Sequence, residues 1–309
     1  MNWINTFEIL CYIIVAILFV DILKNKNYKE LSILISGCLA GFSLELLAVR
    51  FTSIYHYSND FYLSIGIVPY QFPLFGGLMW GSITVCALRI ALKFDFDKLM
   101  TALLTGFLIV SMDLLLDVIA IRLDGGFWIW EGRVIDLTIN HHTFMSVLWV
   151  NFLGYMFEVP AIVYMSLTYF ENNQYKNYFN LLKALIIGFF GVVFVSLASA
   201  ISLFFNKITD EWFSFVAFVI LYIFIFIKFV KAIISNKNNL TFKGNKDFPL
   251  IIFWIVIYTY CICGLIKLEI LQTKLIYGIF SILLAVGTII LSLVCRKDKN
   301  INKMKGQLK

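Results

Sequence analysis

Nine long apolar stretches constrain what this chain can fold into. Each has about 20 residues, the length that an α-helix needs to cross a hydrocarbon layer of about 30 Å. They cover roughly residues 5–24, 31–51, 67–92, 98–122, 144–170, 180–206, 211–234, 249–271 and 275–295. Because 61% of the 309 residues are hydrophobic and 14% are charged, a water-soluble globular fold is excluded. We predict an all-α, polytopic transmembrane helical bundle of about nine spans, with eight to ten compatible because charged residues crowd the last junction.

The distribution of Lys and Arg predicts the orientation of this bundle. Positively charged loops stay on the cytoplasmic side of a membrane. If the N-terminus is outside, 19 of the 25 Lys and Arg residues fall at inner ends and loops. The outer ends keep only Arg50, Arg122, Arg133, Lys207, Lys267 and Lys274. We therefore predict an N-out, C-in arrangement with one transmembrane domain over residues 1–295, including structural spans over 180–295, and a basic cytoplasmic tail over 296–309.

Charge and cysteine content exclude several other classes of protein. The net charge is +6, but the basic residues separate apolar runs and form no patch with stacking aromatics, so we expect no nucleic-acid partner. Six cysteines are scattered through the apolar segments without a CxxC pair, which argues against a disulfide framework or a zinc site. His141 and His142 are neighbours in a loop, where adjacent side chains diverge. We therefore expect no metal and no cofactor.

Carboxylates inside the predicted spans are the strongest functional signal. Each ionisable group there costs about 2.5–3.5 kcal/mol on insertion scales, and four stand out: Glu45, Asp113, Asp117 and Glu158. Asp113 and Asp117 are four residues apart, so they lie on the same helix face one turn apart. Two carboxyls that close cannot both ionise easily, and we expect one to stay protonated as a Brønsted acid. Glu158, beside Pro160, either belongs to this chemistry or only repairs the backbone.

Depth in the membrane groups these residues. At 1.5 Å of rise per residue, Glu45 lies about 9 Å inside the outer end of its span, Asp117 about 8 Å and Asp113 about 14 Å. Asn151 lies about 10 Å inside the fifth span. The third predicted span brings helix-loosening prolines and polar or aromatic side chains to similar depths: Pro69, Gln71, Pro73 and Trp80. We predict a partly polar pocket walled by the second to fifth spans.

Several short motifs, in order, resemble those of a known family. They are Gly41-Phe42-Ser43-Leu44-Glu45, Tyr55-His56-Tyr57, Pro69 and Pro73 leading to Trp80, Asp113-Leu114-Leu115-Leu116-Asp117, Gly126-Phe127-Trp128-Ile129-Trp130, and Trp149-Val150-Asn151-Phe152-Leu153-Gly154-Tyr155. Over about residues 40–165 the chain resembles the membrane carotenoid biosynthesis proteins, which include carotenoid 1,2-hydratases acting on gamma-carotene-type and bacterioruberin-type substrates. The chain departs from the family at two places: Val118 stands where the family has proline, and residues 141–144 replace the Tyr-x-Gly-Val-Pro segment that precedes the Asn-Phe motif. A related terpenoid therefore stays possible as the substrate.

The resemblance implies acid-catalysed hydration of a terminal C=C of a polyene, through a tertiary carbocation and without a redox cofactor. Asp113 and Asp117 are then the acid and its partner, while Glu45 positions or deprotonates the water that Asn151 orients. Aromatic rings would stabilise the cation. The expected substrate-binding residues are Tyr55, Tyr57, Trp80, Trp128, Trp130, Pro69, Pro73 and Gln71. The expected partners are a lipophilic polyene or isoprenoid substrate, water and membrane lipid, in a bacterial-type cell membrane.

Three other interpretations stay open at this point. A membrane terpene or carotene cyclase would use the same acids and differ only in where one water sits. A prenyltransferase would hold a diphosphate through magnesium, but it needs a second acidic cluster and nearby basic residues. A non-catalytic lipid-binding or transport protein would also have a polar cavity. Interfacial anchoring is an alternative explanation for Trp128 and Trp130.

Overall fold

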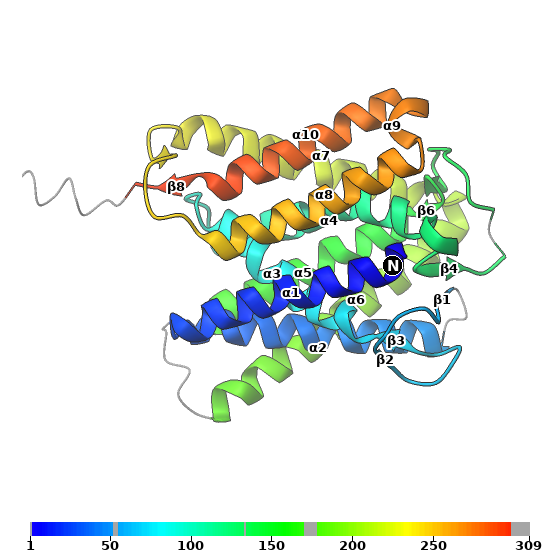
Figure 1. The fold of residues 1–309 in the computed structure, drawn as a ribbon, viewed down its shortest axis with the longest axis horizontal. Helices are drawn as coiled ribbons and strands as arrows, with labels where there is room; N and C mark the ends of the chain where they lie inside the picture. Colours follow the sequence, from blue (N-terminus) through cyan, green and yellow to red (C-terminus); the bar gives the residue numbers. More distant parts are fainter. Residues whose placement is uncertain (1, 52–54, 133, 170–177, 298–309) are drawn as a thin grey trace, which may run out of the picture.

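The computed structural model describes residues 2–132, except 52–54, together with residues 134–169 and 178–297, and it confirms the helical bundle (Figure 1). Nine helices in this part of the chain are long and apolar enough to cross a membrane. They are α1 (Trp3–Lys24), α2 (Tyr28–Phe51), α3 (Leu74–Ala91), α4 (Lys98–Ala120), α5 (Trp149–Tyr169), α6 (Tyr178–Thr209), α7 (Trp212–Asn236), α8 (Phe248–Lys267) and α10 (Leu275–Leu293). Arg133 and most of the predicted tail, 298–309, lie outside the described residues.

Short elements connect these helices. A 3₁₀ turn, η1 (Leu123–Gly125), follows α4, and a single helical turn, α9 (Ile270–Thr273), precedes α10. Within the described residues, four antiparallel strand pairs lie at the ends of the bundle. They are β1 (Tyr55–Tyr57) with β4 (Trp128–Trp130), β2 (Ser64–Ile65) with β3 (Phe72–Pro73), β5 (Thr143–Phe144) with β6 (Val147–Leu148), and β7 (Leu240–Thr241) with β8 (Cys295–Arg296).

Helix α4 lies at the centre of the bundle. Every residue from Leu104 to Ala120 is buried, and α4 packs against α3, α5, α7, α8 and α10. A helix that is enclosed on all sides has no face for lipid or water. Asp113 and Asp117 of this helix are therefore surrounded by protein.

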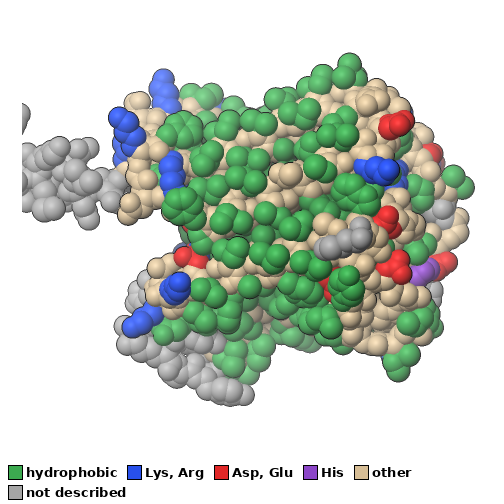
Figure 2. Space-filling model, viewed as in Figure 1, with side chains coloured by type: hydrophobic (Ala, Val, Ile, Leu, Met, Phe, Trp, Pro, Cys, Tyr) green, Lys and Arg blue, Asp and Glu red, His purple; other side chains and the backbone are tan. Residues whose placement is uncertain are grey.

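The outer surface of the bundle is an apolar band between two charged ends (Figure 2). Most of the Lys and Arg side chains visible in this view lie at one end, and most of the Asp and Glu side chains at the other. Helices α6, α7 and α10 expose large apolar side chains such as Phe189, Phe224 and Ile276. The start of α1 and the strand β8 lie at opposite ends of the bundle (Figure 1), and the N-out, C-in orientation stays a prediction.

Two helices begin later than the sequence indicated. The third span begins at Leu74, not at residue 67, because Pro73 is its N-cap with extended backbone and the residues before it form the β2–β3 pair. Proline lacks an N–H and disfavours helix in the residue before it. The prediction that Pro69 and Pro73 loosen a helix is therefore wrong. The fifth span likewise begins at Trp149, after the β5–β6 hairpin, and not at residue 144.

Facing glycines bring α2 and α3 close together. A Cβ atom added at Gly81 would lie 2.3 Å from the carbonyl oxygen of Leu34, and one added at Gly41 would lie 2.5 Å from Cδ1 of Trp80. Small residues permit this approach between membrane helices. Trp80 therefore packs against α2 at Gly41. Glu45 follows Gly41 by four residues, so it lies one helical turn from this contact.

We expect Gly81→Ala to destabilise the bundle, because the new methyl group overlaps backbone of α2 that cannot move alone. Overpacking of this kind costs about 1–3 kcal/mol. The control is Gly287→Ala on α10, where an added Cβ meets nothing within 4 Å and alanine is the better helix former. Thermal unfolding in detergent measures both variants. Equal transition temperatures would contradict the close helix contact.

Candidate active site

A cavity of about 100 Å³ lies between α2, α3, α4, α5 and the β1–β4 pair. At about 30 Å³ per molecule it has room for about three waters or a small apolar group. Ten of the twelve residues predicted from the sequence line it: Glu45, Tyr55, Tyr57, Pro73, Trp80, Asp113, Asp117, Trp128, Trp130 and Asn151. The structure therefore brings the second to fifth spans together around one pocket, as their depths indicated.

The β1–β4 pair covers this cavity with an aromatic roof, formed by Tyr55, Tyr57, Trp128 and Trp130. Tyr55 pairs with Trp130 and Tyr57 with Trp128. Their ring centroids lie 5.2 Å and 6.1 Å apart, respectively. Because side chains alternate along a strand, the residue between the tyrosines, His56, points to the other face. The four aromatic rings therefore share the face that lines the cavity.

Glu45 is held by two phenols of the aromatic roof. Its Oε2 atom accepts a hydrogen bond from the Tyr57 hydroxyl at 2.7 Å and another from the Tyr55 hydroxyl. Burial raises the pKa of both phenols well above its usual value, and the nearby Glu45 carboxyl adds to this effect. Both hydroxyls therefore stay protonated and act as donors. The Glu45 carboxyl, only 5% exposed, is fixed in orientation beside the cavity.

The two aspartates of α4 have different surroundings. Asp117 accepts a hydrogen bond from the Asn151 side-chain amide at 2.9 Å. Asp113 has a buried carboxyl oxygen, Oδ2, that finds no hydrogen-bonding partner among the described residues. Leaving such a group unpaired costs free energy, so an orphaned carboxyl beside a cavity is a candidate for contact with a bound molecule.

The nearby arginines do not neutralise these carboxylates. Arg122 donates to the backbone carbonyls of Val118, at 2.6 Å, of Met145, at 2.9 Å, and of Asp136. Arg50 is exposed at the end of α2. No Lys or Arg belongs to the described lining of the cavity. The carboxylates are thus not paired with these arginines as structural ion pairs.

Two predicted residues lie outside the cavity. Gln71 donates from Nε2 to the carbonyl of Tyr57 at 3.2 Å and to the side chain of Asn59 at 2.6 Å, so it supports the aromatic roof from behind. Pro69 is exposed in the β2–β3 connection. Glu158 is buried, and its Oε2 has no partner among the described residues, but it does not line the cavity.

Two further residues, Tyr155 and Glu8, were not among the site residues predicted from the sequence. Tyr155 lines the cavity and packs against Trp80 with ring centroids 4.6 Å apart. It follows Asn151 by four residues, so helix spacing alone is a signal that would have found it. Glu8, a buried carboxylate of α1, accepts the backbone N–H groups of Tyr62 at 2.7 Å and Leu63 at 3.0 Å.

A larger groove adjoins the cavity from the side. It has a volume of about 420 Å³ and lies between α2, α5 and α6. Five residues line both spaces: Glu45, Tyr55, Trp130, Asn151 and Tyr155. The other lining residues are mostly apolar, and Leu47, Phe51 and Leu203 among them are exposed on the outer surface of the bundle. The buried carboxylates can therefore be approached from the apolar band.

The fold and the cavity together define a multi-pass integral membrane protein with a buried acidic site beside a lipid-facing groove. A family model described as carotenoid biosynthesis protein matches residues 4–221, more than two thirds of the chain. The protein therefore belongs to the family of carotenoid biosynthesis proteins. The match extends beyond the region of motif resemblance to include α1, α6 and part of α7. No curated protein and no solved structure matches the chain.

If Asp113 serves function and not stability, Asp113→Asn should leave the unfolding temperature unchanged or raise it. The reason is that the variant removes a carboxyl with an unpaired oxygen. Arg89→Gln provides the contrast. Arg89 binds Asp21 at 2.8 Å, Glu30 at 2.6 Å and Asp247 at 3.0 Å. Its loss leaves three carboxylates without their cation and should cost about 3 kcal/mol. Unfolding temperatures measured in detergent test both, and a strongly destabilised Asp113→Asn would assign this aspartate a structural role.

Proposed function

We propose that this protein hydrates the terminal C=C of an acyclic polyene or related isoprenoid in a bacterial-type cell membrane. One observation carries the proposal: three carboxyl side chains share a buried, aromatic-roofed cavity that adjoins a lipid-facing groove. Hydration of a trisubstituted alkene needs a proton donor, an environment for a tertiary cation and a held water. The cavity offers candidates for each of these parts.

The hydrogen bonds support a role for each carboxyl. Asp113, whose Oδ2 has no described partner, is the proposed donor; its proton and the alkene π electrons form the new C–H bond at the less substituted carbon. Water then adds to the tertiary cation and gives a proton to Glu45, which the two tyrosines hold in place. Asp117, fixed by Asn151, is the proposed partner through which that proton returns to Asp113. The net reaction adds one water and consumes no proton.

The aromatic side chains support the cationic intermediate. Trp80 and the aromatic roof line the cavity on two sides. A desolvated cation over such a ring gains about 2 kcal/mol. Water held between the carboxyls is the proposed nucleophile that captures the cation.

The groove supplies a place for the rest of the substrate. In this arrangement the polyene chain lies between α2, α5 and α6, and its end group reaches past Glu45 and Tyr155 into the acidic cavity. The chain stays in an apolar environment throughout. Access from the side therefore avoids moving a long hydrocarbon through water.

The central test is coexpression in a host that makes lycopene or other prenyl chains, followed by mass analysis of the lipid extract. We expect a product heavier by one water, and at least about a 100-fold loss of turnover in Asp113→Asn and Glu45→Gln. Glu158→Gln is the matched control, because Glu158 is a buried carboxylate that does not line the cavity. Unaltered turnover in both active-site variants would refute the proposal.

A second variant pair tests the groove. Ala200→Trp fills it, and we expect the apparent KM for a long polyene to rise several-fold while the fold is kept. Ile201→Trp is the control, because the neighbouring Ile201 is 55% exposed and does not line the groove. Equal kinetics of the two variants would show that the substrate does not lie there.

A cyclase is the second candidate, because a proton donor under an aromatic roof also suits ring closure of a polyene cation. In the same extracts it would give an isomer of unchanged mass. A non-catalytic lipid-binding protein would retain the polyene unaltered. The prenyltransferase interpretation has less support, since the described lining of the cavity offers no Lys or Arg for a diphosphate.

A further inference from the structure

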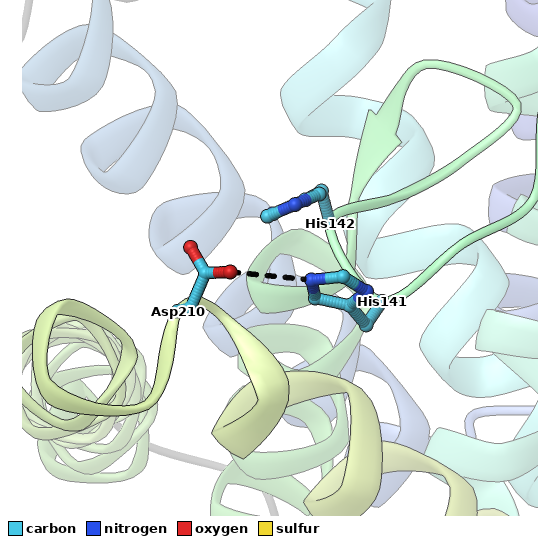
Figure 3. Close-up of side chains that lie close together, drawn as sticks. All are labelled: His141, His142 and Asp210. Atoms are coloured by element: carbon cyan, nitrogen blue, oxygen red, sulfur yellow. Dashed lines mark ion pairs between the residues drawn. The ribbon is translucent and has the colours of Figure 1, made fainter.

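The side chains of His141, His142 and Asp210 lie close together (Figure 3), and none of the three lines the acidic cavity. His141 and His142 belong to the α4–α5 loop, and Asp210 to the α6–α7 turn. One potential ligand atom of each lies within 4.8 Å of the other two. The expectation that the adjacent histidines diverge is wrong, because their ring centroids are 3.9 Å apart.

Local contacts fix the two histidine rings. The Asn140 side-chain oxygen accepts the backbone N–H groups of His142 and Thr143, both at 2.9 Å, which folds this loop back on itself. The Trp149 indole donates to the Asn140 carbonyl at 2.7 Å. The His141 ring stacks on Trp212, with centroids 4.5 Å apart and planes 7° from parallel. Both imidazoles are therefore oriented before any ligand binds.

The α6–α7 turn is held in an uncommon conformation. Asp210 and Glu211 have φ angles of 49° and 64°, in the left-handed region that costs a non-glycine residue about 1–2 kcal/mol. Such backbone persists where surrounding contacts enforce it, and it clusters at functional sites. Here Asn206 and Ser214 enforce it through two hydrogen bonds of 3.0 Å across the turn. The result is that both carboxylates face the histidine pair.

The distances leave room for an ion between these groups. Nε2 of His141 is buried without a hydrogen-bonding partner among the described residues, and the nearest Asp210 oxygen is 3.6 Å away. Ligands of a tetrahedral zinc ion at 2.0–2.2 Å are themselves about 3.3 Å apart. Small side-chain rotations would therefore bring all three groups to bonding distance.

We propose that His141, His142 and Asp210 bind a divalent transition-metal ion of the zinc type. Imidazole nitrogens with a carboxylate oxygen are a donor set typical of zinc. Glu211, whose Oε2 lies 3.1 Å from Nδ1 of His142, orients that ring in the way that carboxylates support metal-bound histidines. Water completes the coordination.

The bound ion would join two segments that border the groove. Leu148 and Val150 follow the histidine loop, and Leu203 precedes the α6–α7 turn; all three line the groove. A metal bridge between loop and turn would fix the outer ends of α5 and α6 relative to each other. This inference does not depend on the proposed hydration, because it concerns binding and stability.

The test uses the full-length protein in detergent, stripped with a chelator and then desalted. Calorimetric titration with zinc should give one site per chain with micromolar or tighter affinity, and cobalt should give the visible absorption of a four-coordinate ion. His141→Ala/His142→Ala should abolish both signals, and Asp210→Asn should weaken zinc binding at least tenfold. Zinc should also raise the unfolding temperature of the intact protein but not of the double variant.

His56→Ala is the matched control. His56 is the one histidine of the sequence outside this cluster. Its Nδ1 atom lies 2.6 Å from the carboxylate of Glu131. Zinc binding should be unchanged in this variant. Failure of the intact protein to bind zinc or cobalt, or binding that survives in the double variant, would overturn the proposal.

Discussion

The desolvation of carboxyl groups on α4 is the constraint on which the rest of the structure depends. Each buried carboxyl costs about 2.5–3.5 kcal/mol in a membrane helix, and Asp113 and Asp117 lie one turn apart on the helix at the centre of the bundle. The neighbouring elements offset this cost for only one of the two carboxyls. Asn151 donates a hydrogen bond to Asp117, whereas Asp113 keeps an oxygen without a described partner. The fold therefore satisfies one carboxyl of the pair and leaves the other with an unpaired oxygen beside the cavity.

The helices beyond the family match close the far side of this centre. The Tyr277 hydroxyl on α10 donates to the carbonyl of Leu114, the residue after Asp113, at 2.7 Å. The Tyr260 hydroxyl on α8 donates to the carbonyl of Trp3 at 2.8 Å. Helices α8 and α10 thus hold α4 and α1 from behind, while α2, α4, α5 and β1 carry the polar lining of the cavity. The carboxylates that line the cavity all belong to the first half of the chain.

Hydropathy and the free-energy cost of polar residues inside a span were sufficient to predict the nine spans, the three cavity carboxylates and Asn151. The length of a span and the depth of a residue follow from 1.5 Å of rise per residue. The start of α3 was predicted wrongly, because an apolar run of residues does not distinguish a helix from a pair of short strands such as β2–β3. The four residues of the aromatic roof were predicted, but the β1–β4 pair that positions them was not. Three-residue strands pair through tertiary contacts and carry no periodic signal. The convergence of His141 and His142 depends on stacking against Trp212, which is distant in sequence.

The unequal sizes of the two adjoining spaces carry one more consequence. A cavity of about 100 Å³ admits only the tip of a polyene, whereas the groove opens sideways on the apolar band and sets no stop for the other end. Under the proposed function, such a site would select substrates by the shape of their terminus and would not discriminate by their length. A molecule with two equivalent ends would have to leave, turn round and bind again before its second end reacts. An enzyme with the proposed activity would therefore act distributively, and the singly modified molecule would accumulate before the doubly modified one.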